Sequence, residues 1–101
     1  MDNYTVRFSG QFQKDIEELE QDFLGFGPEQ TNRFIAEIVQ ACNQLYYFPR
    51  RFEEKALWGQ TYHRLVIHSH KVFYRIFEDE KVVLVDFIVH GSQERFEEKV
   101  K

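Results

Sequence analysis

The stretch from Tyr62 to Gly91 constrains the fold more than any other part of the chain. It reads YHRLVIHSHKVFYRIFEDEKVVLVDFIVHG, an alternation of apolar and polar residues interrupted at two polar points. Runs rich in Val, Ile, Phe and Tyr with a period of two, bounded by short polar groups, are typical of strands joined by hairpins. We therefore predict a three-strand antiparallel meander, and we expect the sheet to carry the function.

The same alternation predicts the core face of this sheet, because successive residues of a strand point to opposite sides. We place the two turns at 69–70 and 78–81, both with an even number of residues, because a one-residue slip would reverse every face. The face expected to pack on the rest of the chain contains His63, Leu65, Ile67, Val72, Tyr74, Ile76, Val83, Val85, Phe87 and Val89.

The opposite face is the first candidate for a functional surface. In the expected register Arg64 lies across from Arg75, Phe73 across from Asp86, and Lys71 across from Ile88. This face is predicted to gather Arg64, Lys71, Arg75, Asp86 and His90 around Val66, Phe73 and Ile88.

The N-terminal half predicts a strand followed by two helices. Residues 3–8 alternate as a short strand, and Ser9 is a suitable N-cap for a helix running to about Phe23. Two glycines interrupt the helical pattern, and Pro28 suits the first turn of a second helix that we expect to reach about Tyr47. The apolar stripes of the two helices are Phe12, Ile16, Leu19 and Phe23, then Phe34, Ile35, Ile38, Ala41, Cys42 and Leu45.

The segment between the second helix and the meander has no clear period. Pro49 ends the helix, because a proline disfavours helical conformation in the residue before it. We interpret residues 50–60 as a connection with a short strand near Ala56 to Trp58. The elements together predict an α+β fold: an N-terminal strand, a two-helix hairpin and the antiparallel meander.

Length and composition predict one globular domain over residues 1–101. Hydrophobic residues make up 43% of the chain and aromatic residues 17%, a composition that does not fit a disordered chain. The single cysteine, Cys42, has no partner for an intramolecular disulfide and is expected to be a core thiol. Neither a signal peptide nor a membrane-spanning stretch is evident, so we expect a cytoplasmic protein with no membrane association. No residue pattern calls for a metal or a cofactor.

The residue types on the outer face admit two interpretations. Two Arg, a Lys and a His could bind phosphate, with His90 acting as general acid or base near neutral pH. The outer face of an antiparallel sheet is also ordinarily charged, and Asp86 could simply neutralise Arg75. The net charge of −4, with 17 acidic and 13 basic residues, does not favour general nucleic-acid binding.

Four segments carry a resemblance to a known family: FSGQFQKDIEEL, LYYFPR, YHRLVIHSHKVFYRI and VLVDFIVHGSQE. Together with the order of the elements, they resemble the RelE/ParE superfamily of bacterial type II toxins over nearly the whole chain. The resemblance implies a compact α+β toxin that arrests growth and is neutralised by a cognate antitoxin. It also implies a toxin–antitoxin heterotetramer or larger assembly and a role in plasmid stabilisation.

The superfamily divides by target, and the resemblance implies a role for the outer face in either branch. RelE-like members cleave mRNA in the ribosomal A site, whereas ParE-like members inhibit DNA gyrase and are not nucleases. The resemblance implies a nuclease set of Arg64, Lys71, Arg75 and His90 for a RelE-like enzyme. For a ParE-like toxin, the residues expected to contact the target or the antitoxin are Arg64, Phe73, Arg75, Asp86 and His90.

Two observations favour the ParE-like branch. Gly91-Ser92-Gln93 lacks the basic cluster that typically follows the terminal histidine in RelE-like nucleases, and the chain is acidic overall. We therefore expect a gyrase inhibitor. The first alternative is a ribosome-dependent mRNA endonuclease, and the second is a non-toxic module that binds an antitoxin.

Overall fold

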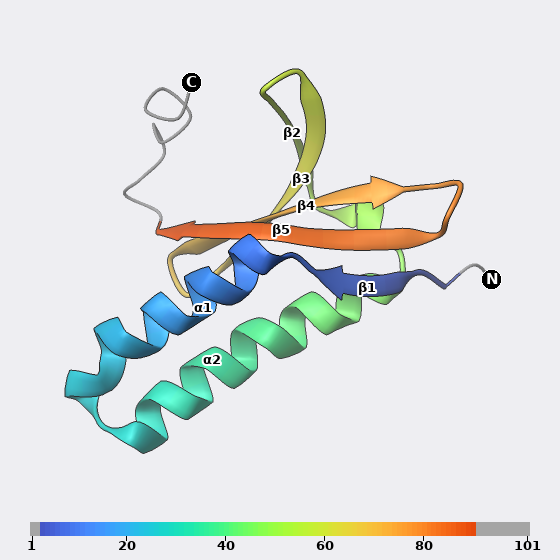
Figure 1. The fold of residues 1–101 in the computed structure, drawn as a ribbon. Coiled ribbons are helices and arrows are strands. Elements are labelled where there is room, and N and C mark those ends of the chain that lie inside the picture. The colour runs from blue at the N-terminus through green and yellow to red at the C-terminus, as the bar shows by residue number, and fades with distance from the viewer. Residues whose placement is uncertain (1–2, 91–101) are drawn as a thin grey trace.

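The computed structural model describes residues 3–90 and has an α+β architecture, in which two helices cover one face of a five-stranded sheet (Figure 1). The strand order is β1-β5-β4-β3-β2, with β1 parallel to β5 and all other neighbours antiparallel. The predicted meander is confirmed as β3, β4 and β5. The element bounds are β1 Thr5–Phe8, α1 Gly10–Phe23, α2 Pro28–Asn43, β2 Glu53–Leu57, β3 Gln60–Ile67, β4 His70–Phe77 and β5 Val82–His90.

The helix starts are as predicted, and the end of α2 is not. The Ser9 side chain accepts a hydrogen bond from the Phe12 amide at 3.0 Å and so caps α1, and Pro28 occupies the first turn of α2. The second helix ends at Asn43 and not near Tyr47, because the chain tightens there into a 3-10 turn, η2 (Gln44–Tyr46).

Strand β2 extends the sheet beyond the predicted meander. It covers Glu53–Leu57, so the short strand expected near Ala56 to Trp58 overlaps it only at Ala56 and Leu57. The chain returns into β3 through Trp58 and Gly59, whose φ values of 50° and 75° give the left-handed pair that a two-residue hairpin turn requires. The sequence shows this strand poorly, because only Leu57 of its five residues is buried.

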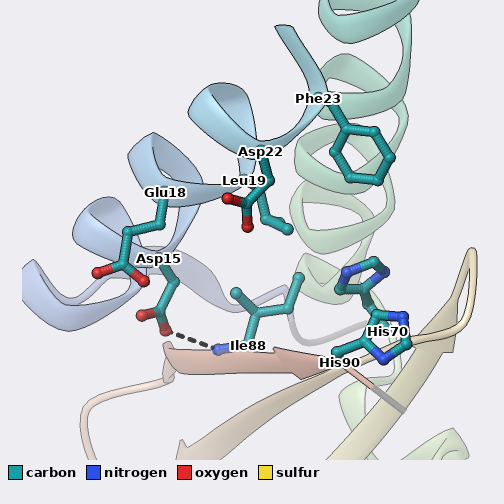
Figure 2. A pocket seen from close by; sticks show the side chains of 8 residues that line it. All are labelled: Asp15, Glu18, Leu19, Asp22, Phe23, His70, Ile88 and His90. Atoms are coloured by element: carbon teal, nitrogen blue, oxygen red, sulfur yellow. Dashed lines mark hydrogen bonds between the residues drawn. The ribbon is translucent and has the colours of Figure 1, made fainter. Parts of the chain in front are cut away.

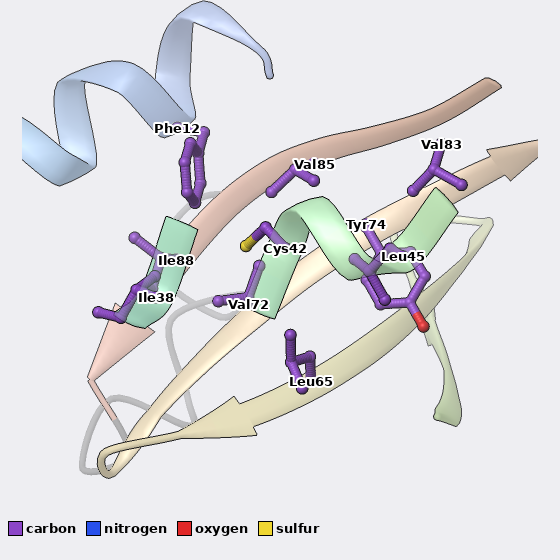
Figure 3. Packing of buried hydrophobic residues seen from close by; sticks show 10 residues of the cluster. All are labelled: Phe12, Ile38, Cys42, Leu45, Leu65, Val72, Tyr74, Val83, Val85 and Ile88. Atoms are coloured by element: carbon purple, nitrogen blue, oxygen red, sulfur yellow. The ribbon is translucent and has the colours of Figure 1, made fainter. Parts of the chain in front are cut away.

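The core fills the space between the helices and the sheet (Figure 3). Helix α2 contributes Ile38 and Cys42, and the turn η2 contributes Leu45, each with no exposed surface, as the helical spacing predicts. Burial raises the pKa of the Cys42 thiol to about 12, so the group remains protonated and acts as a core residue. The other members of this cluster are Phe12, Leu65, Val72, Tyr74, Val83, Val85 and Ile88.

A β-bulge in β5 changes the faces of its C-terminal half. Tyr74 pairs with Val85 and Phe73 pairs with Phe87, so Asp86 is an extra residue on β5. Beyond the bulge the alternation reverses. The predicted core positions Phe87 and Val89 were therefore wrong, and Ile88 lies in the core instead.

Helix α1 stabilises the bulge. The Ser9 hydroxyl donates a hydrogen bond to the Asp86 carbonyl oxygen, and the Asp15 carboxylate accepts one from the Ile88 amide at 3.0 Å. Both bonds satisfy backbone groups next to the position where the extra residue interrupts the ladder. The first turns of α1 thus hold β5 in the bulged register.

The turn between β3 and β4 lies one residue earlier than predicted. His68 and Ser69 form it, with φ values of 51° and 63°, in place of the expected residues 69–70. Arg64 consequently pairs with Phe73, not with Arg75, and Lys71 pairs with Val66 on one side and Val89 on the other. The faces of both strands are unchanged, because the register moves by an even number of residues.

Candidate functional site

The outer face of the sheet is built on a small aromatic layer, which we call the outer cluster. It consists of Leu57, Tyr62, Phe73, Phe87 and Val89. Phe73 stacks on Phe87 with ring centroids 4.9 Å apart and is only 2% exposed. Phe73 was predicted to contact the target or the antitoxin, but its burial makes it a support for the face and not a contact residue.

Arg75 and Asp86 meet on this face, as the sequence predicted. An Arg75 guanidinium nitrogen lies 3.2 Å from an Asp86 carboxylate oxygen, and the Tyr62 hydroxyl donates to the same carboxylate at 3.2 Å. The guanidinium also lies over the Tyr62 ring, 5.4 Å from its centroid. Burial and the neighbouring Asp86 charge raise the pKa of Tyr62. The basic group of Arg75 is thus already neutralised and held in place.

Arg64 and Lys71 also lie on the outer face. Arg64 forms an ion pair with Glu53 of β2, a strand that the sequence placed only in part. Since β2 supplies this carboxylate, the charge of Arg64 is compensated at the sheet edge. The face therefore carries two arginines paired with carboxylates around an aromatic layer, an arrangement that suits contact with a protein surface better than binding of a polyanion.

His90 lies on the helix-facing side of the sheet, apart from the other predicted residues. The bulge at Asp86 turns it to the same side as Ile88, where its ring contacts that of His70 with centroids 4.9 Å apart. The prediction that His90 shares a face with Arg64, Lys71 and Arg75 was therefore wrong. Gly91, Ser92 and Gln93, which entered the choice between the two branches, lie outside the described residues.

A pocket of about 390 Å³ opens beside the two histidines, and Figure 2 shows its lining. We call it the acidic pocket, because three carboxylates from α1 line one side of it. Sequence reasoning missed it, since the acidic side of α1 has the ordinary pattern of a solvated helix face. The lining residues are Asp15, Glu18, Leu19, Asp22, Phe23, His70, Ile88 and His90.

His63, on the core side of β3, makes the stability of the fold depend on pH. Its ring stacks on Tyr74, it is 5% exposed, and its Nδ1 is buried without a hydrogen-bond partner. Burial lowers the pKa of His63, the Glu54 charge opposes this shift, and the Arg50 charge adds to it.

We expect the free energy of unfolding to fall as the pH drops below about 6.5, the pKa of an unfolded histidine. The folded state favours neutral His63, so the stabilisation is complete above that pH and is lost as the pH falls through the lower folded pKa. Urea unfolding between pH 5 and pH 8 measures this, and His63→Phe keeps an aromatic ring while removing the titrating group. An equal pH slope in the variant would assign the effect to other groups.

A comparison with protein families identifies the chain. The model described as the ParE toxin of the type II toxin–antitoxin system, parDE, matches residues 6–95. The chain belongs to this family of ParE toxins. The predicted membership of the RelE/ParE superfamily is therefore confirmed, and so is the coarser prediction of a type II toxin–antitoxin toxin. A comparison with curated protein sequences gives no significant match.

Solved structures share the fold of this ParE-family chain. It is similar to a chain of a chromosomal ParDE system from P. aeruginosa, with a TM-score of 0.75 and 12% identity, covering 89% of this chain and 98% of that one. It is also similar to a chain of a RelBE toxin–antitoxin complex from Mycobacterium tuberculosis, with a TM-score of 0.69 and 22% identity, covering 89% of this chain and 93% of that one. A chain of an archaeal RelE–RelB complex from Pyrococcus horikoshii has a TM-score of 0.62 and 18% identity, covering 90% of this chain and 98% of that one. At these identities the likeness confirms the α+β fold.

Two features of the ParE-family chain bear on its partners and ligands. None of the helices within residues 3–90 is long and apolar enough to cross a membrane. Over the same residues, no group of three or more His, Cys, Asp or Glu side chains is arranged to hold a metal ion.

Proposed function

We propose that this chain arrests bacterial growth by acting on DNA gyrase and that a cognate antitoxin neutralises it. The family match supports a ParE toxin, and the gyrase target is what the sequence resemblance implies for this branch. One structural observation supports it over RNA cleavage: the two arginines of the outer face, Arg64 and Arg75, are paired with carboxylates, and His90 is on the opposite side of the sheet.

A phosphodiester-cleaving site needs groups that hold the phosphate and a proton donor or acceptor within reach of the same atoms. Here the Arg75 guanidinium contacts Asp86, and Arg64 contacts Glu53. His90 instead lies beside His70. The predicted nuclease set is thus divided between two faces, which favours a protein-binding mode of action for the outer face.

The antitoxin and the assembly form part of the same proposal. The similar ParDE, RelBE and RelE–RelB structures are those of toxin–antitoxin systems. Exposed apolar side chains at the tip of the helix hairpin, Leu24 at 52% and Phe26 at 68%, offer a surface for a partner segment. We propose a toxin–antitoxin complex of heterotetrameric or larger size.

Expression of the chain alone in bacteria, with two readouts from one culture, tests the proposal. We expect growth arrest, relaxation of a reporter plasmid and intact translated mRNA, and we expect coexpression of the antitoxin to restore growth. Codon-specific mRNA cleavage that His90→Ala or Arg64→Ala abolishes would replace the proposal with the endonuclease alternative. The absence of growth arrest from a folded chain would favour the non-toxic module.

A further inference from the structure

The acidic pocket presents hydrogen-bond acceptors to an incoming group. The carboxylates of Glu18 and Asp22 line its mouth and make no hydrogen bond or ion pair within residues 3–90. The Asp15 carboxylate lies deeper, where it also accepts from the Ile88 amide. Figure 2 shows these three carboxylates on one side of the pocket and the two histidine rings on the other.

His70 adds an acceptor at the opposite wall. Its Nδ1 lies 2.8 Å from the His68 carbonyl oxygen, which can only accept, so Nδ1 carries the proton. In the neutral ring Nε2 is then an acceptor, and no hydrogen bond within residues 3–90 engages it. The residue is only 4% exposed, so a donor can reach this nitrogen only through the pocket that the ring lines. A donor that enters the pocket can therefore form a hydrogen bond with this nitrogen.

The remaining lining of the pocket is apolar. Leu19 and Ile88 lie between the carboxylates and the histidines, and Phe23 lies above the histidine rings in Figure 2. Such walls suit the aliphatic stem of a long basic side chain, and an aromatic wall also attracts a cation. The combination of apolar walls with acceptors at both ends matches an arginine or lysine side chain and does not match an anion.

A second apolar surface continues from the same wall. Phe23 also lines a neighbouring groove with Phe26 and Phe34, and Phe26 is the most exposed large hydrophobic residue of residues 3–90. A partner segment could therefore place an apolar side chain in this groove and a basic side chain in the acidic pocket. This pattern describes an amphipathic polypeptide segment with a basic residue next to its apolar face.

We propose that the acidic pocket receives an arginine or lysine side chain from the toxin-binding segment of the antitoxin. The proposal rests on the antitoxin partnership proposed above and adds the contact by which a basic side chain of the antitoxin is held on the toxin. Charge complementarity identifies the occupant: three carboxylates from α1 and the unengaged His70 Nε2 face a single opening. The bound cation then donates hydrogen bonds to Glu18, Asp22 and the His70 Nε2, beside Asp15, which already accepts from Gln11 and Ile88.

A pair of charge-neutralising variants tests the proposal. Glu18→Gln with Asp22→Asn removes two charges inside the pocket, and Glu17→Gln with Glu20→Gln removes two charges from the same helix outside it. The affinity of each full-length variant for the separately purified antitoxin is measured by calorimetry, after its thermal midpoint shows that it is folded. We expect the dissociation constant to rise about 10- to 100-fold for the pocket pair, from the usual strength of hydrogen bonds to charged groups. For the control pair we expect a change within about twofold.

NMR of the histidine side chains locates the effect. In chain labelled with ¹⁵N-histidine, we expect the Nε2 resonance of His70 to shift when the antitoxin binds. N-acetyl-arginine amide is expected to shift it as well, and the uncharged isostere N-acetyl-citrulline amide is not. These small probes report on the pocket independently of the antitoxin.

The outcomes separate this inference from the proposed function. Equal antitoxin affinities for the wild type and the pocket pair, with no shift at His70, would overturn the inference and leave the toxin–antitoxin pairing intact. A wild-type chain that binds no antitoxin would instead overturn the antitoxin part of the proposed function.

Discussion

Phe73→Ala is expected to lower the free energy of unfolding by about 3–5 kcal/mol, the usual cost of removing a buried phenylalanine ring. The side chain is 2% exposed and contacts both the Tyr62 and the Phe87 rings. Its removal leaves a cavity under the outer face and withdraws the support of Tyr62, which holds Asp86. A domain of this size is stable by about 5–15 kcal/mol, so the loss is a large part of the total.

Urea unfolding of the purified chain measures this effect, and Phe26→Ala is the matched control. Phe26 is also a phenylalanine but is 68% exposed, so its removal should change stability by about 0.5 kcal/mol or less. Similar losses for the two variants would contradict the packing of the outer cluster. If Phe73→Ala lowers gyrase inhibition only in proportion to the fraction of chain that has unfolded, Phe73 acts through the stability of the fold and not through contact with the target.

Ile38→Ala is expected to cost about 2–5 kcal/mol, and Ile38→Val about 0.5–1.5 kcal/mol. Ile38 has no exposed surface and lies in the same buried cluster as Val72 of β4 and Ile88 of β5, between α2 and the sheet (Figure 3). The graded pair separates the loss of packing from a general disturbance of the helix. A loss below about 1 kcal/mol for alanine would mean that α2 is not packed on the sheet as described.

The sequence predicted most of the fold because its patterns are local. The stripe through Ile38, Cys42 and Leu45 follows the helical period, and alternation from Leu65 to Tyr74 follows the strand period, so both give the buried face without knowledge of the partner element. The turn between β3 and β4 lies at His68 and Ser69 and not at residues 69–70, and this shift did not change which residues face the core. The Arg75–Asp86 pair was predicted correctly because Asp86, the bulged residue itself, still lies on the outer face, and the alternation reverses only after it.

The errors arise where a distant element decides the local structure. The bulge at Asp86 depends on Ser9 and Asp15, more than 70 residues earlier in the chain, and the segment DFIVH contains no glycine to mark it. Phe87, Ile88 and Val89 are all apolar, so the sequence alone permits either Ile88 or the pair Phe87 and Val89 to face the core. Contacts with α1 decide between the two. The misplacement of His90 and the missed acidic pocket follow from this one register change.

A supercoiling assay with purified bacterial gyrase tests the central claim most directly. The chain is titrated into gyrase and relaxed plasmid, alone and with an equimolar amount of its antitoxin. We predict that supercoiling is inhibited in a concentration-dependent way, that cleaved DNA–gyrase complexes accumulate, and that the antitoxin restores supercoiling. Unchanged supercoiling at every concentration of a folded chain, with no accumulated cleavage complexes, would contradict the claim.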